Sequence, residues 1–352
     1  SLASARSVLE AVAGTLDVTP LVIDRQGRML DAADSHRALT DVATRASEAA
    51  GATPPEAGAA GSGPLSLSQA GVDGQPRAGE DVASTLARLR RDGFEVVFPL
   101  LHGPYGEDGS VQGLLRLLDV PFVGTDVLGS AVAMDKLMMK TVFAAHGFPQ
   151  VDYRALTRSA WRRDRNACLE SLAGLTWPRF VKPANLGSSI GILRVEAPEA
   201  LATAVDAAFA FDRRVIVEEG VLGARELEVG VLGNDVVEVS PVGEVRYASA
   251  FYDYDTKYSD GCAELLVPAP IEQTVAERAR ALARAAFAAV DGAGLSRVDF
   301  LYRESDDRLY LNEVNTLPGF TRHSMYPKLF EAAGVPYPEL IARLIALARQ
   351  PR

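Results

Sequence analysis

Cysteine and histidine are scarce in this sequence. It has 2 cysteines and 4 histidines in 352 residues, and Cys168 and Cys262 stand alone, without a C-x-x-C pair or a neighbouring histidine. A disulfide framework and a zinc-ligand cluster are therefore both disfavoured. Unclustered cysteines are typical of a reducing compartment, so we expect the protein in the cytoplasm.

Long apolar runs and an excess of positive charge are also missing. No stretch approaches the ~20 consecutive apolar residues of a membrane-spanning helix. The sequence has 36 Lys+Arg against 46 Asp+Glu, a formal net charge of −10. This balance disfavours a protein that binds the phosphate backbone of nucleic acids, although a local basic groove is compatible with it. We expect neither a membrane nor a nucleic acid as a partner.

Three common catalytic motifs are absent as well. There is no G-x-x-x-x-G-K-[ST] phosphate loop, and the glycines of GAAGSG (58–63) do not follow a predicted strand, as a dinucleotide-binding turn would. Ser188 and Ser189 do not lie in a G-x-S-x-G turn, so serine-hydrolase chemistry has no support.

The length exceeds the ~250–300 residues at which a single core stops growing. Strand, turn and helix patterns over 1–124 predict a Rossmann-like domain with a parallel sheet. It is interrupted at about 34–80 by an insertion rich in Ala, Gly, Pro and Ser, to which we assign no chemistry. One helix is predicted over 125–147, capped by Thr125 or Asp126 and closed by Gly147. We predict three domains, 1–124, 125–223 and 224–352, in an α/β (α+β) fold.

The segment 295–315 predicts two paired strands with a turn at 304–308. Side chains two residues apart in a strand point to the same face, so Asp299 on one strand and Glu313 and Asn315 on the other should converge. Two carboxylates and a carboxamide are hard oxygen ligands that suit Mg²⁺ held together with substrate phosphates. The alternative is a solvated polar face of a hairpin.

Lysines at separate places could bind phosphate. Lys182 follows an apolar strand and precedes a proline, where a partly buried charge is costly unless an anion compensates it. Lys136 and Lys140 lie on a helix, and for them a plain surface position is equally compatible with the sequence. The loop ANLGSSIG (184–191) after Lys182 offers backbone N–H groups and hydroxyls to an anion, but such Gly/Ser turns are common.

Seven motifs occur in the order expected for one family. Together they resemble the ATP-grasp superfamily, and more narrowly the D-alanine–D-alanine ligases of peptidoglycan synthesis. The segments that carry this resemblance are LHGPYGEDGSVQG (101–113), MDK (134–136), FVKPANLGSSIG (180–191), VEEGVLGARELEVGVLG (217–233), FYDYDTKY (251–258), SRVDF (296–300) and NEVNTLPGFTRHSMYP (312–327).

The resemblance implies an ATP site and a metal site. The residues that it implies for the ATP site would contact the phosphates, the adenine or the ribose. They are Lys136, Lys182, Ser189, Glu218, Glu219, Val221, Glu226, Phe251 and Lys257, and Glu313 would contact ATP through the metal ions. It implies two Mg²⁺ or Mn²⁺ ions on Asp299, Glu313 and Asn315. The resemblance also allows a monovalent cation such as K⁺ as a further cofactor.

The resemblance also implies two D-alanine sites. Ser188 and Tyr258 would support the first D-alanine, Ser324 and Met325 would bind the carboxylate of the second, and His102 would lie near the acceptor. Arg297 and the backbone of Gly319 would stabilise the oxyanion, and Lys257 would reach the γ-phosphate from a mobile loop at 250–262. A homodimer through the N-terminal domain, in the bacterial cytoplasm, is the expected assembly.

The implied reaction joins two D-alanines through a D-alanyl phosphate. Lys257–Tyr258 and Ser324–Met325 match the dipeptide ligases better than the D-lactate- or D-serine-using relatives, which remain an alternative. A second alternative is a silent ATP-binding regulator of the same fold. The family normally opens with a strand and an amine-binding Glu, whereas Ser1 corresponds to the serine after them, so we expect both upstream of Ser1.

Overall fold

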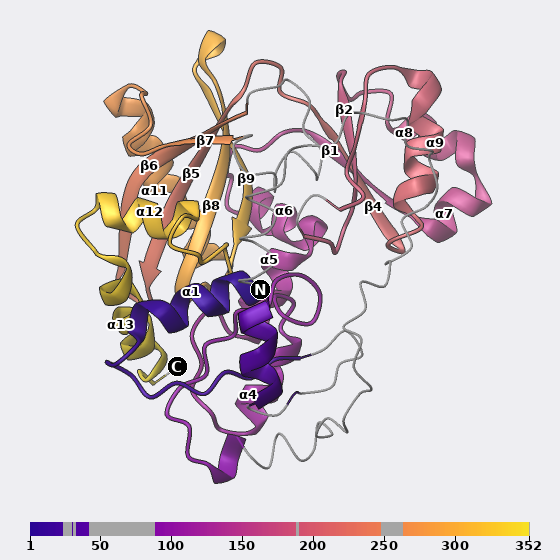
Figure 1. Cartoon of the computed structure of the whole chain (residues 1–352). Coiled ribbons are helices and arrows are strands. Elements are labelled where there is room, and N and C mark those ends of the chain that lie inside the picture. Colours follow the sequence, from indigo (N-terminus) through magenta and orange to yellow (C-terminus); the bar gives the residue numbers. More distant parts are fainter. Residues whose placement is uncertain (24–29, 31–32, 42–88, 188–189, 248–262, 352) are drawn as a thin grey trace, which may run out of the picture. The chain divides into compact units, whose positions relative to one another are not determined.

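The computed structural model describes residues 1–23, 30, 33–41, 89–187, 190–247 and 263–351. Contacts within the chain divide it into two compact units (Figure 1). One comprises Ser1 with Phe94–Arg352, and the other comprises Leu2–Gly93. The division into three domains at 124 and 223 stays a prediction.

The unit Leu2–Gly93 begins with helix α1 (Leu2–Val12), as the spacing of its apolar residues predicts, and Val8 and Val12 are buried. After it, the amide of Leu30 donates to the carbonyl of Val22 at 2.8 Å. Helical residues follow at 33–41 and 89–91. Most of the predicted insertion lies outside the described residues.

The predicted parallel sheet is much smaller in the described residues than we expected. Val97 forms a parallel bridge with Phe122, and helix α4 (Ser110–Leu117) connects the two segments. The bridge consists of Val97 N donating to Pro121 O and Val123 N donating to Val97 O. Pro99 and Pro121 have no amide hydrogen, so neither segment can extend the ladder far.

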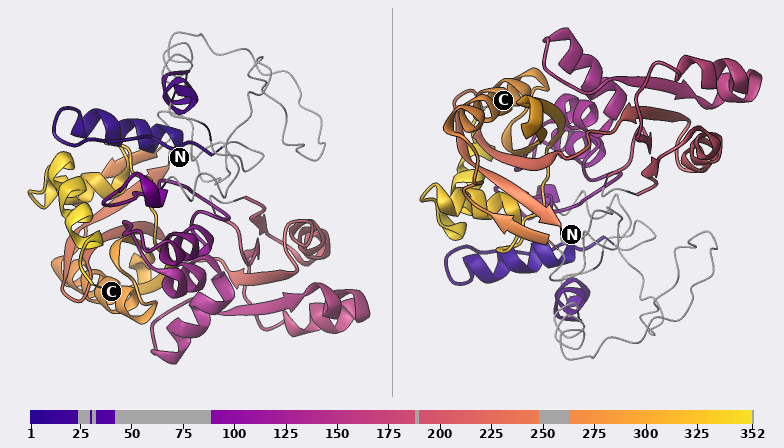
Figure 2. Two further views of the ribbon diagram at one scale, coloured as in Figure 1. Left: turned by 90° about the horizontal axis from the view of Figure 1, so that it is seen from below. Right: turned by 90° about the horizontal axis from the view of Figure 1, so that it is seen from above.

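A four-stranded antiparallel sheet follows. It consists of β1 (Tyr153–Thr157), β2 (Arg179–Pro183), β3 (Leu193–Val195) and β4 (Arg214–Glu219), in the order β1-β4-β2-β3. Helices α7 (Arg158–Arg163), α8 (Arg165–Ser171) and α9 (Pro198–Ala208) pack on one face through a core that includes Trp161, Val205 and Val217. Figure 2 shows these helices, in magenta to pink, beside the strands they cover.

The opposite face of this sheet carries Ile216, Lys182 and Glu218, because residues paired or two apart in a sheet share a face. Ile216 packs there against Leu137 of helix α6 (Lys136–Ala145). One face of the small sheet is thus closed by three helices, and the other presents two charged side chains toward α6.

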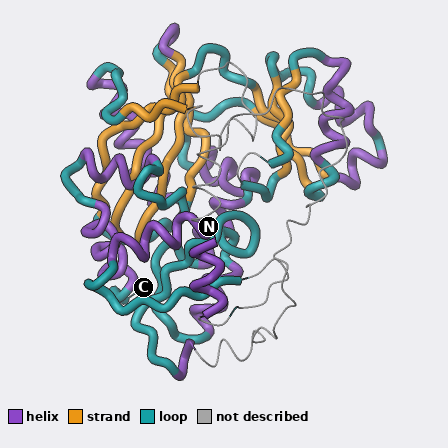
Figure 3. Tube along the Cα trace, in the orientation of Figure 1, coloured by secondary structure: helices purple, strands orange, loops and turns teal. Residues whose placement is uncertain are grey.

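A five-stranded antiparallel sheet forms the rest of the larger unit (Figure 3). Its strands are β5 (Arg225–Gly233), β6 (Val237–Tyr247), β7 (Ala263–Leu266), β8 (Gly294–Arg303) and β9 (Arg308–Asn315), in the order β7-β6-β5-β8-β9. The 3₁₀ turn η1 (Glu304–Asp306) joins β8 to β9 where the turn is predicted.

Each face of the five-stranded sheet packs on helices. Leu227, Val229 and Val298 face α11 (Gln273–Ala289) and α6 in the main core. On the other face lie α12 (Met325–Ala332) and α13 (Tyr337–Ala348). A Cβ atom at Gly230 would come within 2.7 Å of the Phe330 ring, and one at Gly243 within 2.8 Å of the Met325 sulfur. These two glycines therefore let the start of α12 lie close on the sheet.

The single helix predicted over 125–147 is wrong. The chain forms α5 (Val127–Met134) and α6, separated by Asp135, whose extended backbone ends the first helix. The Asp135 carboxylate accepts hydrogen bonds from the amides of Leu137 and Met138, so it caps the second helix. Asp126 caps α5 and Gly147 follows α6 with φ 68°, both as predicted.

Among the described helices, none combines the length and the apolar character needed to cross a membrane.

Candidate active site

The predicted convergence on the β8–β9 hairpin is confirmed. Arg297 lies opposite Asn315 and Asp299 lies opposite Glu313, with an irregularity of the register immediately after Asp299. On the other side of β8, Glu228 of β5 pairs with Asp299. The pattern places these polar side chains on the α12 face of the sheet, opposite the apolar side chains that pack on α11.

Arg297 neutralises part of this acidic group. Its Nε and Nη2 atoms donate to the two oxygens of Asp299 at 2.7 and 2.6 Å, and Nε lies 3.1 Å from Glu228 Oε2. Burial opposes the guanidinium charge, but Asp299 and Glu228 outweigh it and hold the pKa of Arg297 above its usual range. The pKa of Asp299 is raised to about 7, because burial and the carboxylates of Glu228 and Glu313 outweigh Arg297.

Such a group suits a divalent cation. Burial, together with the carboxylates of Glu228 and Glu313, raises the pKa of Asp299, and carboxylate and amide oxygens are the ligands that Mg²⁺ accepts. Within the described ranges no three His, Cys, Asp or Glu residues lie close enough together to hold a metal. The predicted set instead combines two carboxylates with the Asn315 amide, whose Oδ1 accepts from Leu317 N at 3.2 Å.

A second charged group lies on the small sheet. Glu218 of β4 pairs with Lys182 of β2, at 2.5 Å between Nζ and Oε2, and with Lys140 of α6, at 3.1 Å between Nζ and Oε1. Burial opposes ionisation of Glu218, but Lys140 and Lys182 outweigh it and lower its pKa to about 2. Lys140 is only 1% exposed, so a plain surface position for this lysine is wrong.

Lys136 lies one turn before Lys140 on α6. Its Nζ donates to the carbonyl of Leu186 at the start of the glycine loop, and its backbone amide donates to Ala184 O at 3.0 Å. Burial lowers the pKa of Lys136, and the nearby carboxylate of Glu313 opposes this shift only in part. Two of the predicted phosphate-binding lysines therefore stand beside the entrance of the glycine loop.

The end of β4 is positioned by backbone contacts. Glu219 Oε1 accepts from Thr176 N at 2.8 Å, and Gly220 N donates to Pro178 O at 2.7 Å. Val221 follows in the turn toward β5, and Glu226 lies near the start of β5 on the same face as Glu228. The carboxylate of Glu219 is engaged by Thr176 N, so any contact of Glu219 with a base falls to its backbone.

The loop 101–109 adds His102 and one residue that sequence reasoning missed. His102 Nδ1 lies 3.0 Å from Leu317 O, and burial lowers the pKa of His102 to about 4. Glu107 accepts a hydrogen bond from Gly103 N, and a Cβ atom on Gly187 would lie 3.6 Å from its Oε2 atom. Burial raises the pKa of Glu107 to about 7. The only available signal was its place in a glycine-rich motif.

The start of α12 organises the remaining predicted substrate residues. Ser324 is the N-terminal cap residue of α12; its Oγ accepts from Thr321 N at 3.0 Å and lies 2.8 Å from Thr321 Oγ1. Gly319 comes close to it, since a Cβ there would lie 3.3 Å from Ser324 Oγ. Met325 is buried against Val245 and Leu329.

Five predicted site residues, together with the whole of the loop 250–262, lie outside the described residues. They are Ser188, Ser189, Phe251, Lys257 and Tyr258.

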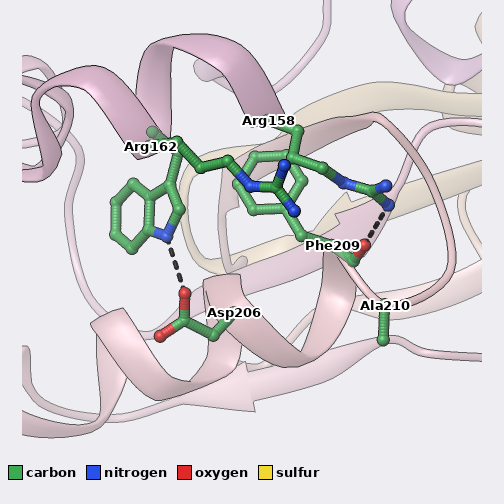
Figure 4. Close-up of a pocket in the computed structure, with 6 residues that line it drawn as sticks. Arg158, Arg162, Asp206, Phe209 and Ala210 are labelled. Carbon is green, nitrogen blue, oxygen red and sulfur yellow. Dashed lines mark hydrogen bonds between the residues drawn. The ribbon is translucent and has the colours of Figure 1, made fainter.

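A pocket of about 350 Å³ lies elsewhere, on the α7 and α9 side of the small sheet (Figure 4). Three of its polar side chains are already engaged: Trp161 Nε1 donates to Asp206 Oδ1 at 2.7 Å, and Arg158 donates to the carbonyls of Phe209 and Asp212. None of the predicted site residues that the structure describes lines it.

Comparisons with known proteins agree along the whole chain. The family model for the D-Ala-D-Ala ligase N-terminus matches residues 1–125, and that for the C-terminus matches residues 142–346. A D-alanine–D-alanine ligase from Deinococcus radiodurans is 49% identical over 354 residues, covering 100% of this chain and 95% of that protein.

Solved structures of similar proteins are also ligases. VanG D-Ala:D-Ser ligase from Enterococcus faecalis has a TM-score of 0.78 at 30% identity, over 99% of this chain and 94% of that one. The D-alanine–D-alanine ligase from Coxiella burnetii has a TM-score of 0.73 at 32% identity, over 99% and 89% of the two chains.

Proposed function

The chain belongs to the D-alanine–D-alanine ligase family, and from this premise we propose its reaction and the roles of its residues. It is an ATP-dependent ligase with the ATP-grasp fold that joins two D-alanines into D-alanyl-D-alanine for peptidoglycan synthesis. The observation that carries this function is the 49% identity with a D-alanine–D-alanine ligase over the whole chain.

ATP binds between the two charged groups. Lys136 and Lys182 contact its phosphates, supported by their position at the glycine loop and by the partial exposure of Lys182, whose side chain is 14% exposed. Glu218, Glu219 and Val221 face the adenine, Glu226 holds the ribose, and Phe251 packs on the base. Ser189 closes over the phosphates and Lys257 reaches the γ-phosphate.

Asp299, Glu313 and Asn315 hold two Mg²⁺ or Mn²⁺ ions. When bound, such ions neutralise the charge of the phosphates during transfer. The pairing of Asp299 with Glu313 on adjacent strands supports this assignment, because it brings two carboxylates together beside the Asn315 amide.

The reaction has two steps. The carboxylate of the first D-alanine attacks the γ-phosphorus of ATP, which gives D-alanyl phosphate and ADP. The amine of the second D-alanine then attacks the acyl carbon, and phosphate leaves. The protein mainly positions the reactants, since phosphoryl transfer requires little covalent participation from it.

The remaining residues orient the two D-alanines. Arg297 and the Gly319 amide stabilise the tetrahedral oxyanion of the second step, and the two hydrogen bonds that Arg297 donates to Asp299 hold the guanidinium in place for this. Ser188 and Tyr258 support the first D-alanine, and His102 lies near the second. Ser324 and Met325, fixed at the start of α12, bind the carboxylate of the second.

D-Alanine is preferred to D-serine or D-lactate as the acceptor because Lys257–Tyr258 and Ser324–Met325 match the dipeptide ligases. A silent regulator is not favoured, because a buried group of three carboxylates and one guanidinium is costly to maintain without a ligand. We further propose a homodimer through the N-terminal domain, in the cytoplasm, where ATP is supplied.

The test is phosphate release from ATP with D-alanine alone and with D-serine or D-lactate added as a competing acceptor. We expect D-alanine-dependent release and D-alanyl-D-alanine as the main product in every mixture. A mixed dipeptide or ester as the main product would contradict the acceptor assignment. No release with any acceptor would contradict the enzyme assignment.

A further inference from the structure

The group Lys140–Glu218–Lys182 contains one lysine that the proposed reaction does not use. Lys140 reaches Glu218 from α6, and its Nζ also lies 5.6 Å from the centre of the Tyr153 ring. The side chains of Lys140 and Glu218 are 2% and 4% exposed, against 14% for Lys182. Lys140 is thus sealed behind Glu218, whereas Lys182 stands on the side open to a ligand.

The two lysines cannot have the same task once a nucleotide is bound. Lys182 is the partly exposed cation, and in the proposed function its amine contacts phosphate oxygens. Lys136 also faces this group, but its Nζ is engaged with Leu186 O. When Lys182 moves to the phosphates, Lys140 is the one lysine among the described residues that is still paired with Glu218. Without it, Glu218 would be a buried carboxylate without a partner, which normally takes up a proton.

The protonation state of Glu218 matters for the base. An ionised carboxylate only accepts hydrogen bonds, and two lysines occupy only part of its acceptor capacity. Adenine presents a 6-amino donor to such a group, whereas guanine and hypoxanthine present a 6-oxo acceptor. A protonated Glu218 could donate to the 6-oxo group instead.

We propose that Lys140 is a positioning residue that keeps Glu218 ionised and fixed at the base edge while Lys182 binds phosphate, and that it thereby sets the preference for ATP over GTP and ITP. This inference rests on the proposed function, in which Glu218 faces the adenine. A merely structural Lys140 would lower stability and leave the preference among bases unchanged.

The test compares Lys140→Met with Lys140→Arg. Methionine keeps the length without charge, and arginine keeps the charge. The readout is kcat/KM for ATP, GTP and ITP at saturating D-alanine. We expect Lys140→Met to lower the ATP:ITP and ATP:GTP ratios by about tenfold or more, which is the free-energy equivalent of a shift of one pKa unit or more in Glu218. Lys140→Arg should stay within about threefold of the wild type.

A double-mutant cycle shows whether Lys140 acts through Glu218. Glu218→Gln alone should lower the same ratios, because a carboxamide can both donate and accept. In the Glu218→Gln background, Lys140→Met should change them no further. The double variant leaves no lone carboxylate, so it provides the test even if Lys140→Met alone does not fold.

Three results would overturn the inference: unchanged ratios in folded Lys140→Met, unchanged ratios in Glu218→Gln, or a further loss in the double variant. Each is read against wild-type protein that releases phosphate with ATP and D-alanine. An inactive wild type would contradict the proposed function itself, so the two failures are distinguishable.

Discussion

Replacing Arg297 by lysine separates its structural role from its catalytic role. Arg297 makes two parallel hydrogen bonds to Asp299, at 2.7 and 2.6 Å, and lies 3.1 Å from Glu228. Lysine keeps the positive charge but cannot form this two-pronged contact. Hydrogen bonds to charged groups contribute about 1.5–3 kcal/mol each, so losing one should destabilise the protein by about 2 kcal/mol. For a unit of this size the melting temperature should fall by about 4–8 °C.

The catalytic effect should be larger than the effect on stability suggests. Removing one donor from an oxyanion site costs about 10²–10³ in kcat. We therefore expect Arg297→Lys to lower kcat about 100-fold at 25 °C, where the variant is folded, and to change the KM for ATP by less than about threefold. The assay is D-alanine-dependent phosphate release, together with thermal unfolding followed by circular dichroism.

The matched control is Arg303→Lys on the same strand. Arg303 makes a similar two-pronged contact with Asp306, at 2.8 and 2.6 Å, but at the far, exposed end of β8. Its kcat should stay near the wild-type value. A folded Arg297→Lys variant with near-normal kcat, or an equal loss of kcat in both variants, would refute the assignment of Arg297 to the oxyanion.

Three further predictions concern the metal, pH and the acceptor. Glu313→Gln should raise the Mg²⁺ concentration for half-maximal activity about tenfold or more, whereas Glu331→Gln, on an exposed part of α12, should not; equal Mg²⁺ titrations would contradict the metal assignment. The folded-state pKa of His102, about 4, lies below its ordinary 6.5, so the folded state binds fewer protons and loses stability as the pH falls from 6.5 to 4. The free energy of unfolding that is lost between pH 7 and pH 4.5, measured with urea, should be smaller in His102→Gln than in the wild type by on the order of 2 kcal/mol. Equal losses in the two proteins would count against this role of His102. Tyr258→Phe should loosen the discrimination against D-lactate relative to D-alanine, and unchanged acceptor selectivity at several pH values would argue against this role of Tyr258.

The acidic hairpin could be predicted from the sequence because it depends on local rules. Side chains alternate along a strand, and the turn at 304–308 is short, so the pairing of Asp299 with Glu313 follows from residues close together in the chain. The helix break at Asp135 depends on an equally local rule, capping by an aspartate, but the apolar pattern runs through it and suggests a single helix.

The buried lysine could not be predicted in the same way. Lys140 looks like any lysine on an amphipathic helix, and its burial depends on Glu218, which comes from a distant strand. Glu107 is similar, because its raised pKa results from burial in a loop whose neighbours come from several elements. The burial of these two side chains depends on residues far apart in the chain, so local patterns could not predict it. The parallel sheet that local patterns favoured was limited by the prolines at 99 and 121.

The most direct test of the proposed reaction is to follow a carboxylate oxygen. D-Alanine labelled with ¹⁸O in its carboxylate is supplied with unlabelled ATP, and the released phosphate is analysed by mass spectrometry. An acyl phosphate intermediate transfers one carboxylate oxygen to phosphorus, so each phosphate should carry one ¹⁸O atom. Phosphate without ¹⁸O, released while D-alanyl-D-alanine forms, would contradict the two-step mechanism.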